Sequence, residues 1–154
     1  MPGTVAARLA ALGLTLPAAP APAANYVPFV LDGSTLWVSG QISQDANGLI
    51  RGRLGADMDV AAGAAAARTC ALALIAQAQA ALGDLDRVAR VVKLTGFVNS
   101  TADFTDQPEV INGASTLMVE VFGDAGRHAR AAVSAVALPR GVAVEVEAVF
   151  AIAD

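Results

Sequence analysis

The sequence predicts an α+β domain in which two helices cover one face of a mixed sheet. Segments with alternating apolar residues, typical of strands, occur before, between and after two segments with apolar residues at helical spacing. The resulting order is two strands, helix, strand, helix, two strands. This order is expected when the helices pack together on one side of a single sheet.

The stretch YVPFVLDGSTLWVSGQIS predicts a hairpin. Val27, Phe29 and Leu31 alternate before the Asp-Gly-Ser turn, and a second apolar run, LWV, follows it. The next segment, QDANGLIRGRLG, is predicted to be a loop with a turn at Asn47-Gly48.

Two helices are predicted from spacing and end signals. The longer helix runs from Asp59 to Leu82 and is stopped by Gly83. Because its apolar face consists mainly of Ala, this helix can lie close against a sheet. The second helix is predicted over residues 107–121, with Pro108 in its first turn.

A central strand is predicted over 86–100, and a last pair of strands is joined by LPRG, whose Pro139 and Gly141 are typical of a connection. Both of the last two strands hold charge among apolar neighbours, with Arg130 in the first and Glu145 in the second. Long charged side chains are seldom buried without a partner. Each therefore lies either on a solvated face of its strand or at the edge of a pocket.

Residues 1–24 are predicted to form a short helix and an Ala/Pro linker ahead of a domain spanning 25–154. Thr4 fits the N-cap of this helix and Gly13 fits its stop. The segment loosely imitates a signal peptide, but the positions of Thr4 and Gly13 favour the helix. The apolar segment 60–83 is mainly Ala and carries Arg and Gln side chains, so it is a poor membrane span. We expect a soluble, cytoplasmic protein that does not bind membranes.

Composition argues against several classes of function. The 154 residues are 55% hydrophobic and 16% charged, which predicts one domain that buries surplus apolar surface by self-association. A net charge of -4, without basic runs interleaved with aromatics, argues against a nucleic-acid partner. The single Cys70, expected to pack in the core, excludes an internal disulfide. The lone His128 excludes a multi-His metal site, and we expect no metal and no cofactor.

Three stretches carry a family resemblance: VSGQI at 38–42, GDLDRVARVVKLTGFVNSTADF at 83–104 and ARAAVSAVALPRGVAVEVEAVF at 129–150. With them the chain, over roughly residues 25–152, resembles the RidA/YjgF family of reactive-intermediate (enamine and imine) deaminases, also labelled endoribonuclease L-PSP. The third stretch is the most specific, with an Arg nine residues before the Pro of Leu-Pro and then an alternating Val-Glu strand. The resemblance implies a chorismate-mutase-like fold and a homotrimer. In that trimer the sheets line a central barrel and ligand clefts lie between subunits.

The resemblance also implies two catalytic residues. Arg130 is the anchor for a substrate carboxylate, because a guanidinium offers two parallel donors; an interface salt bridge is the alternative. Glu145 is the residue that positions and deprotonates water. Glu147, two residues on and on the same strand face, is the weaker candidate.

Further substrate-binding positions carry over from the family. Gly40 meets the ligand through its backbone, unless it is only a tightly packed strand position. Asn112 lies near the cleft on the second helix, with ordinary surface exposure as the alternative. Tyr26 is an aromatic pocket residue, although Phe29 competes for this role and core packing is open for both.

Two further binding positions depart from the family. Ala132 stands where the family often has Cys, so its backbone N–H can still serve an acid but no thiol is present. His128 stands where deaminase members have Pro, and is either a structural or a pocket residue. The segment before Asn112 is also longer than in the short deaminases. Together these departures indicate a longer subgroup of the family, whose substrate can differ from the enamine of those deaminases.

The implied reaction is hydrolysis of small 2-imino or enamino acids, of the 2-iminobutanoate or 2-iminopropanoate type, to 2-keto acids and ammonia. It needs no metal, cofactor or nucleophile–base pair, and the sequence indicates none of these. The alternative is a non-catalytic trimer that binds small carboxylates or has a regulatory role. The absence of the family Cys and the presence of His128 leave this alternative open. RNA cleavage, implied only by the older label, disagrees with the charge and the single His.

Overall fold

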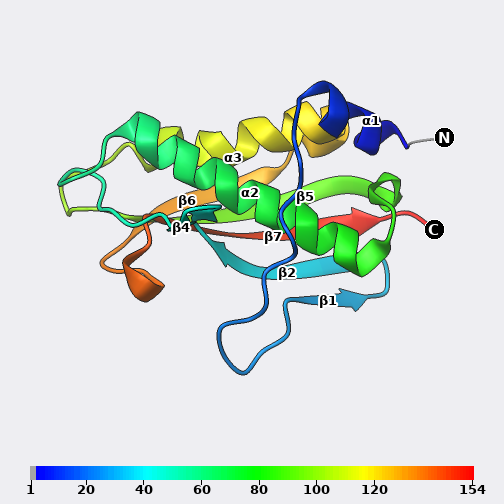
Figure 1. Ribbon diagram of the computed structural model, residues 1–154, viewed down its shortest axis with the longest axis horizontal. Helices are drawn as coiled ribbons and strands as arrows, with labels where there is room; N and C mark the ends of the chain where they lie inside the picture. The colour runs from blue at the N-terminus through cyan, green and yellow to red at the C-terminus, as the bar shows by residue number, and fades with distance from the viewer. Residues whose placement is uncertain (1–2) are drawn as a thin grey trace.

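The computed structural model describes residues 3–154 and confirms, for them, an α+β fold with two long helices on one face of a mixed sheet. The strand order is β1-β2-β7-β5-β6; β5 and β6 run parallel, and the other neighbours antiparallel. The strands are β1 (Phe29–Asp32), β2 (Thr35–Ile42), β5 (Val88–Asn99), β6 (Ala129–Ala135) and β7 (Val144–Ile152). The helices are α2 (Val60–Leu82) and α3 (Gln107–Phe122), which lie side by side (Figure 1).

Smaller elements connect this framework. They are α1 (Thr4–Ala11), β3 (Gln44–Asp45), β4 (Gly48–Leu49) and the 3-10 helices η1 (Leu85–Arg87), η2 (Gly123–Gly126) and η3 (Pro139–Gly141). The loop predicted after β2 thus contains a small hairpin, β3–β4, whose turn residues are Ala46 and Asn47, one position before the predicted Asn47-Gly48.

The two C-terminal strands are not neighbours in the sheet. β5 lies between them, pairing antiparallel with β7 and parallel with β6. The chain reaches β6 only after α3, which is the crossover that a parallel pair of strands requires. β6 is therefore an edge strand, whereas β7 is internal. This order separates Arg130 at the edge from Glu145 in the middle of the sheet.

Helix α2 begins and ends where the sequence predicts. The carboxylate of Asp59 accepts a hydrogen bond from the backbone N–H of Ala62 at 2.8 Å, and Gly83, with φ +78°, ends the helix. Small residues let α3 approach closely, because a Cβ at Gly113 would overlap the backbone carbonyl of Ala64. α2 is long and apolar enough to cross a membrane, yet 56% of its most apolar window is buried within this fold. It has the position of a core helix.

The core lies between the two helices and the sheet. Large side chains from both layers are fully buried, among them Leu36, Leu94, Phe150, Leu74 and Ile111. Burial of each such side chain contributes about 1.5–3 kcal/mol. α3 approaches β5 at Gly96, where an added Cβ would clash with the Ile111 side chain. This contact fixes the position of α3 beside the β6 edge.

Helix α1 packs against α3 and contributes Val5 and Leu9 to the core. Gly13, with φ +68°, ends this helix as predicted, but the prediction of Thr4 as its N-cap is wrong. The helix begins at Thr4, and the backbone N–H groups of Thr4 and Val5 donate to the carboxylate of Asp86, each at 2.9 Å. A residue 82 positions away supplies the cap.

Residues 14–24, predicted as a linker, run over the outer surface of α2 (Figure 1). Leu14 and Leu16 pack against the core. Gln77 of α2 donates from Nε2 to the backbone oxygen of Pro20 at 2.7 Å. The N-terminal segment is thus packed onto the rest of the fold, and a domain boundary at residue 24 stays a prediction.

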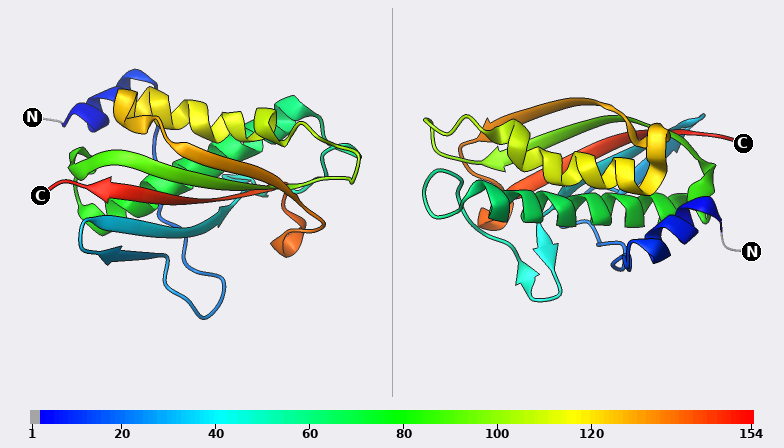
Figure 2. Two further views of the ribbon diagram at one scale, coloured as in Figure 1. Left: turned by 180° about the vertical axis from the view of Figure 1, so that it is seen from behind. Right: turned by 90° about the horizontal axis from the view of Figure 1, so that it is seen from above.

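The second face of the sheet carries no helix within residues 3–154 (Figure 2, left). Val30, Trp37 and Val133 lie on this face, and they are 50%, 54% and 44% exposed. Apolar patches of this kind often mark sites of protein association. We call this surface the open face; it is the candidate surface for association between copies.

Candidate functional site

Arg130 lies on β6 and reaches toward α3. Its Nη1 donates to Oδ1 of Asn112 at 2.8 Å and to Oγ of Ser115 at 3.2 Å. The two α3 residues are three positions apart, so they share one face of the helix. These contacts fix the guanidinium, while Nε and Nη2 have no hydrogen-bond partner among residues 3–154. The structure thus brings the predicted residues Arg130 and Asn112 together.

His128 belongs to the same group of side chains, as the sequence allowed. Its Nε2 lies 2.8 Å from Oγ of Ser115, and its Nδ1 lies 2.6 Å from the carbonyl oxygen of Gly126. Burial lowers the pKa of His128 below its ordinary value, the positive charge of Arg130 lowers it further, and the Gly126 contact opposes both. A groove of about 260 Å³, which we call the Arg130 groove, is lined by Ser115, Val119, Arg127, His128 and Arg130.

Ala132, also predicted as a binding position, follows Arg130 by two residues and therefore points to the same face of the sheet. It is partly buried and packs against the core next to Gly96, its register partner on β5. Its methyl group adds no polar or reactive atom to the groove.

Glu145 lies on β7 and lines a different hollow, a cavity of about 550 Å³ that we call the Glu145 cavity. An added Cβ at Gly40 would overlap the Glu145 carboxylate, so the glycine leaves room for that side chain. Burial raises the pKa of Glu145 above its ordinary value, and the negative charge of Glu147 raises it further. Glu147 is exposed and lies on the same face two residues on, as predicted.

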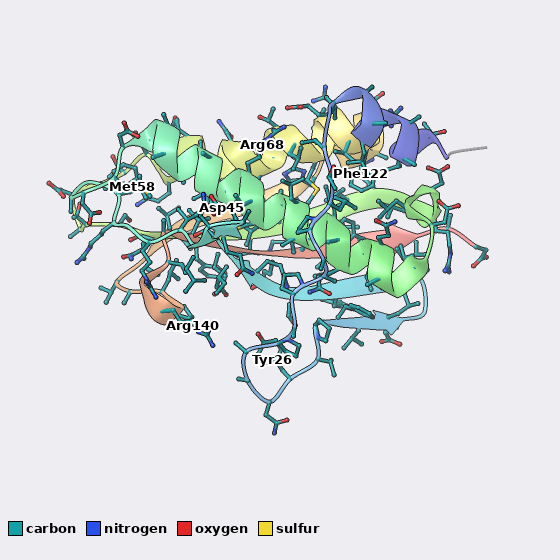
Figure 3. All side chains as sticks on the ribbon, in the orientation of Figure 1. Tyr26, Asp45, Met58, Arg68, Phe122 and Arg140 are labelled. Atoms are coloured by element: carbon teal, nitrogen blue, oxygen red, sulfur yellow. The ribbon has the colours of Figure 1, made fainter. Side chains whose placement is uncertain are left out.

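Tyr26 also lines the Glu145 cavity, whereas its competitor Phe29 packs against the core. Figure 3 shows Tyr26 on the loop before β1 and Arg140 on η3, both in the lower part of the view. The backbone N–H of Ala23 donates to the Tyr26 hydroxyl at 3.3 Å, which folds this loop toward the cavity. Tyr26 is therefore the better candidate for the aromatic pocket residue.

One chain does not bring Arg130 and Glu145 together. Arg130 is in register with Leu94, which is in turn in register with Ala148, and both of these partners are buried beneath the helices. Glu145 is three residues before Ala148, an odd separation along a strand, so it points to the opposite, open face. The predicted catalytic residues thus occupy two half-sites on opposite faces of one sheet.

Sequence reasoning missed Ser115 and Arg140. Ser115 lies three residues after Asn112 on a helix, so helical periodicity could have paired these two, and strand periodicity could have paired His128 with Arg130 two residues on. Only the fold brings the two pairs together. The sequence reasoning noted no nucleophile–base pair, and it did not anticipate the hydroxyl–imidazole contact between Ser115 and His128.

Arg140 lines the Glu145 cavity from η3. It has φ +60°, a left-handed conformation that is uncommon outside glycine. Nε of Arg51 donates to its carbonyl oxygen at 2.8 Å and holds the turn. A local Pro-Arg-Gly signal predicts a turn here, but only the fold places it beside Glu145.

Cys70 lies on α2 beneath β7 and is fully buried. Its Sγ donates to the carbonyl oxygen of Val144 at 3.5 Å. Burial raises the pKa of the thiol, and the charge of Glu145 raises it further. Because thiolate formation is disfavoured, Cys70 has the packing role that the sequence predicts.

Comparison with known proteins shows which proteins this chain is similar to. A family model described as "YjgF/chorismate mutase-like, putative endoribonuclease" matches residues 6–151. Protein TCP17 from Trypanosoma cruzi is 58% identical over 148 residues, which are 95% of this chain and 92% of that protein. A solved structure from Agrobacterium tumefaciens, of unknown function, is 47% identical with a TM-score of 0.89, over 97% of this chain and 92% of that one.

A second solved structure, a "putative endoribonuclease" from Shewanella oneidensis, is 36% identical with a TM-score of 0.93, over 97% of this chain and all of that one. The family match begins within α1 and ends within β7, so it includes every element that lines the two half-sites. The chain therefore belongs to the RidA/YjgF family.

Proposed function

We propose that the protein is a homotrimeric deaminase, which hydrolyses small 2-imino or enamino acids to 2-keto acids and ammonia at clefts between copies. The observation that carries this proposal is the separation of Arg130 and Glu145 onto opposite faces of one sheet. Each residue lines a hollow of its own. A second copy that sets its Glu145 cavity against the Arg130 groove of the first would complete the site.

The Arg130 groove supplies acid binding. Asn112 and Ser115 hold Nη1, so little side-chain freedom is lost when a ligand arrives. Nε and Nη2 then offer two parallel donors to the two oxygens of a carboxylate. This arrangement orients a 2-imino acid through its acid group and leaves the C=N carbon for attack from the other half-site.

The Glu145 cavity supplies the base. A carboxylate with a raised pKa takes a proton from water more readily than an ordinary Glu does. The water oxygen forms a bond to C2 as one water proton passes to Glu145, and the C=N electrons move to nitrogen, which takes that proton from Glu145. The C2–OH group then gives its proton to Glu145, which passes it to the amine; the C2–N bond breaks, ammonia leaves, and the carbonyl of the keto acid forms. One imine and one water thus give one keto acid and one ammonia.

The open face supports assembly. Its exposed apolar side chains would be covered if the sheets of three copies faced a common centre. Glu145 lies on the open face together with these apolar side chains, while Arg130 lies on the edge strand β6. Packing of the edge of one sheet near the open face of the next therefore also brings the half-sites together.

The test is hydrolysis of imines generated in the assay by an amino-acid oxidase, with semicarbazide trapping the imine that remains. The wild-type protein should shorten the lifetime of imines from small amino acids, and the Arg130→Ala variant should not. Imine lifetimes that the wild type leaves unchanged, across several amino acids, would overturn the proposal.

A second candidate function is binding of small keto acids without turnover, which the Ala132 position favours. Its methyl group packs against the core, so no reactive side chain follows Arg130 in the groove. Saturable binding of 2-ketobutyrate by a protein that hydrolyses no imine would support this function instead.

A further inference from the structure

The Arg130 groove holds a hydroxyl–imidazole pair that the proposed imine hydrolysis does not use. Oγ of Ser115, on α3, lies 2.8 Å from Nε2 of His128, which immediately precedes β6. A hydroxyl within hydrogen-bond reach of a general base is the first requirement for a serine nucleophile. The second requirement is a third group that orients the base.

Hydrogen bonds to both imidazole nitrogens of His128 determine which nitrogen carries the proton and which one accepts from Ser115. Nδ1 of His128 lies 2.6 Å from the carbonyl oxygen of Gly126, which can only accept, so Nδ1 carries the proton. Nε2 then offers its lone pair, and the Ser115 O–H donates to it. Nη1 of Arg130, 3.2 Å away, donates to the Ser115 oxygen. The imidazole is therefore oriented by a backbone carbonyl with its free lone pair toward Ser115.

Charge in the groove also suits attack by Ser115. Burial and the Arg130 charge hold the pKa of His128 below its ordinary value, so the imidazole is the free base at neutral pH. The same guanidinium, in contact with the Ser115 oxygen, favours negative charge that develops there or on a neighbouring carbonyl oxygen.

The pair is accessible to a small molecule. Ser115 and His128 are both partly exposed and line the groove of about 260 Å³. The second cation of the groove, Arg127, has its Nε 3.5 Å from a carboxylate oxygen of Asp124. Arg130 has Nε and Nη2 free among residues 3–154 and is therefore the group that can hold the acid end of a ligand.

We propose that Ser115 is a nucleophile activated by His128, and that the Arg130 groove hydrolyses activated esters of short dicarboxylic acids. The free carboxylate of the ester binds Arg130, so this inference shares its acid anchor with the proposed deaminase but needs no Glu145. The Ser115 oxygen bonds to the ester carbonyl carbon while its proton passes to Nε2 of His128. The bond from that carbon to the alcohol oxygen then breaks, and Nε2–H gives the proton to the leaving oxygen. Water, deprotonated by the same Nε2, then attacks the acyl carbon. The bond from that carbon to the Ser115 oxygen breaks, the oxygen takes the proton back from Nε2–H, and the dicarboxylic acid is released.

The experiment uses the full-length protein with p-nitrophenyl hydrogen glutarate, and p-nitrophenyl acetate as the ester without a free acid. We expect release of p-nitrophenolate and an acyl adduct on Ser115, detected by peptide mass spectrometry, with the glutarate ester reacting faster. Ser115→Ala should abolish the adduct, and His128→Gln should slow acylation about 10²–10⁴-fold. Ser134→Ala is the matched control, because the Ser134 hydroxyl contacts Ser100 at 2.7 Å and no imidazole.

The pH profile separates a base from a merely structural histidine. Acylation by the wild type should rise with pH and level off with a midpoint below 6.5, the ordinary pKa of His, since only the neutral imidazole accepts a proton. This limb should vanish in His128→Gln. Equal acylation of wild type and Ser115→Ala would overturn the nucleophile, and equal rates for the two esters would overturn the substrate class. Imine hydrolysis by the wild type, measured alongside, separates a failure here from a failure of the deaminase proposal.

Discussion

Gly40 and Glu145 face each other across the β2–β7 pair so closely that a Cβ on Gly40 would overlap the Glu145 carboxylate. Gly40 lies where β2 shifts register against β7, between Val38 and Gln41. A bulge next to a functional side chain re-aims that side chain. The glycine thus determines where the carboxylate lies in its cavity.

We predict that Gly40→Ala lowers imine turnover and destabilises the protein by about 1 kcal/mol or less, at or below the low end for an added methyl group. The reason is that the methyl group displaces the flexible end of the Glu145 side chain, so the carboxylate must move while the backbone can stay. The trapping assay measures the first effect, and denaturant unfolding measures the second. In a Glu145→Ala background the added methyl has room, so the stability loss should largely disappear. The same loss in both backgrounds would contradict this contact.

We predict that Arg130→Lys harms keto-acid binding nearly as much as Arg130→Ala. A Lys ammonium cannot remain on Asn112 and Ser115 and also present two parallel donors. Loss of a charge-assisted hydrogen bond of about 1.5–3 kcal/mol weakens binding roughly ten- to a hundredfold. Calorimetric titration with 2-ketobutyrate measures this. Arg87→Lys, at the end of η1 just before β5, is the control. Wild-type affinity in Arg130→Lys would mean that Arg130 acts only as a diffuse charge.

We predict that Glu145→Gln lowers imine turnover about 10²–10⁴-fold, the contribution of a positioned acid or base, while keto-acid binding persists. Gln is isosteric with Glu, so the fold should be kept, and Arg130 still holds the acid group. Steady-state kinetics and calorimetry on the same preparations measure the two effects. Glu147→Gln is the matched control on the same strand face, and it should change neutral-pH turnover little.

We predict that Glu147→Gln moves the acid limb of the turnover profile to lower pH. Turnover needs ionised Glu145, so it falls as pH decreases through the pKa of that residue. Burial is the larger cause of the raised pKa of Glu145, and the negative charge of Glu147 raises that pKa further. Removing this charge lets Glu145 stay ionised at lower pH. Turnover measured from pH 4 to 8 shows the shift. Superimposable profiles would mean that Glu145 is not the base or that Glu147 does not reach it.

We predict that Trp37→Asp dissociates the proposed trimer, because it places a charge on the open face. Sedimentation velocity at micromolar concentration should show smaller species, and imine turnover should be lost with the shared sites. Leu12→Asp, at an exposed apolar position just after α1, is the control and should keep the trimer. A wild type that sediments as a monomer would contradict both the assembly and the shared site.

Much of the fold could be predicted from local patterns. Alternation identified the strands, and the end signals at Asp59 and Gly83 located α2 correctly, since both act within one turn of the helix. The prediction of Thr4 as an N-cap is wrong because the acceptor for the first N–H groups of α1 is the Asp86 carboxylate, a contact that only the folded chain creates. The insertion of β5 between β6 and β7 likewise depends on long-range pairing.

The arrangement of the two half-sites also depends on long-range pairing that local sequence patterns do not reveal. Resemblance to the family singled out Arg130 and Glu145, and the strand pattern alone marks them as unusual charges. The fact that they point to opposite faces follows from register, which no local pattern reveals. Ser115 had a local signal, its spacing from Asn112, but a serine on a helix surface is ordinary until a histidine from another element contacts it.

Residues 20–24, in the segment predicted as a linker, form one wall of the Glu145 cavity. That wall is tethered by the Gln77 contact to Pro20 and, further back, by the Asp86 carboxylate that holds the start of α1. For protein engineering, residues 20–24 are therefore part of the site, and the segment from Thr4 onward holds them in place. Trimming the chain at residue 25 would open the cavity to solvent on one side. A purification tag placed at the C-terminus leaves the wall and its tethers intact.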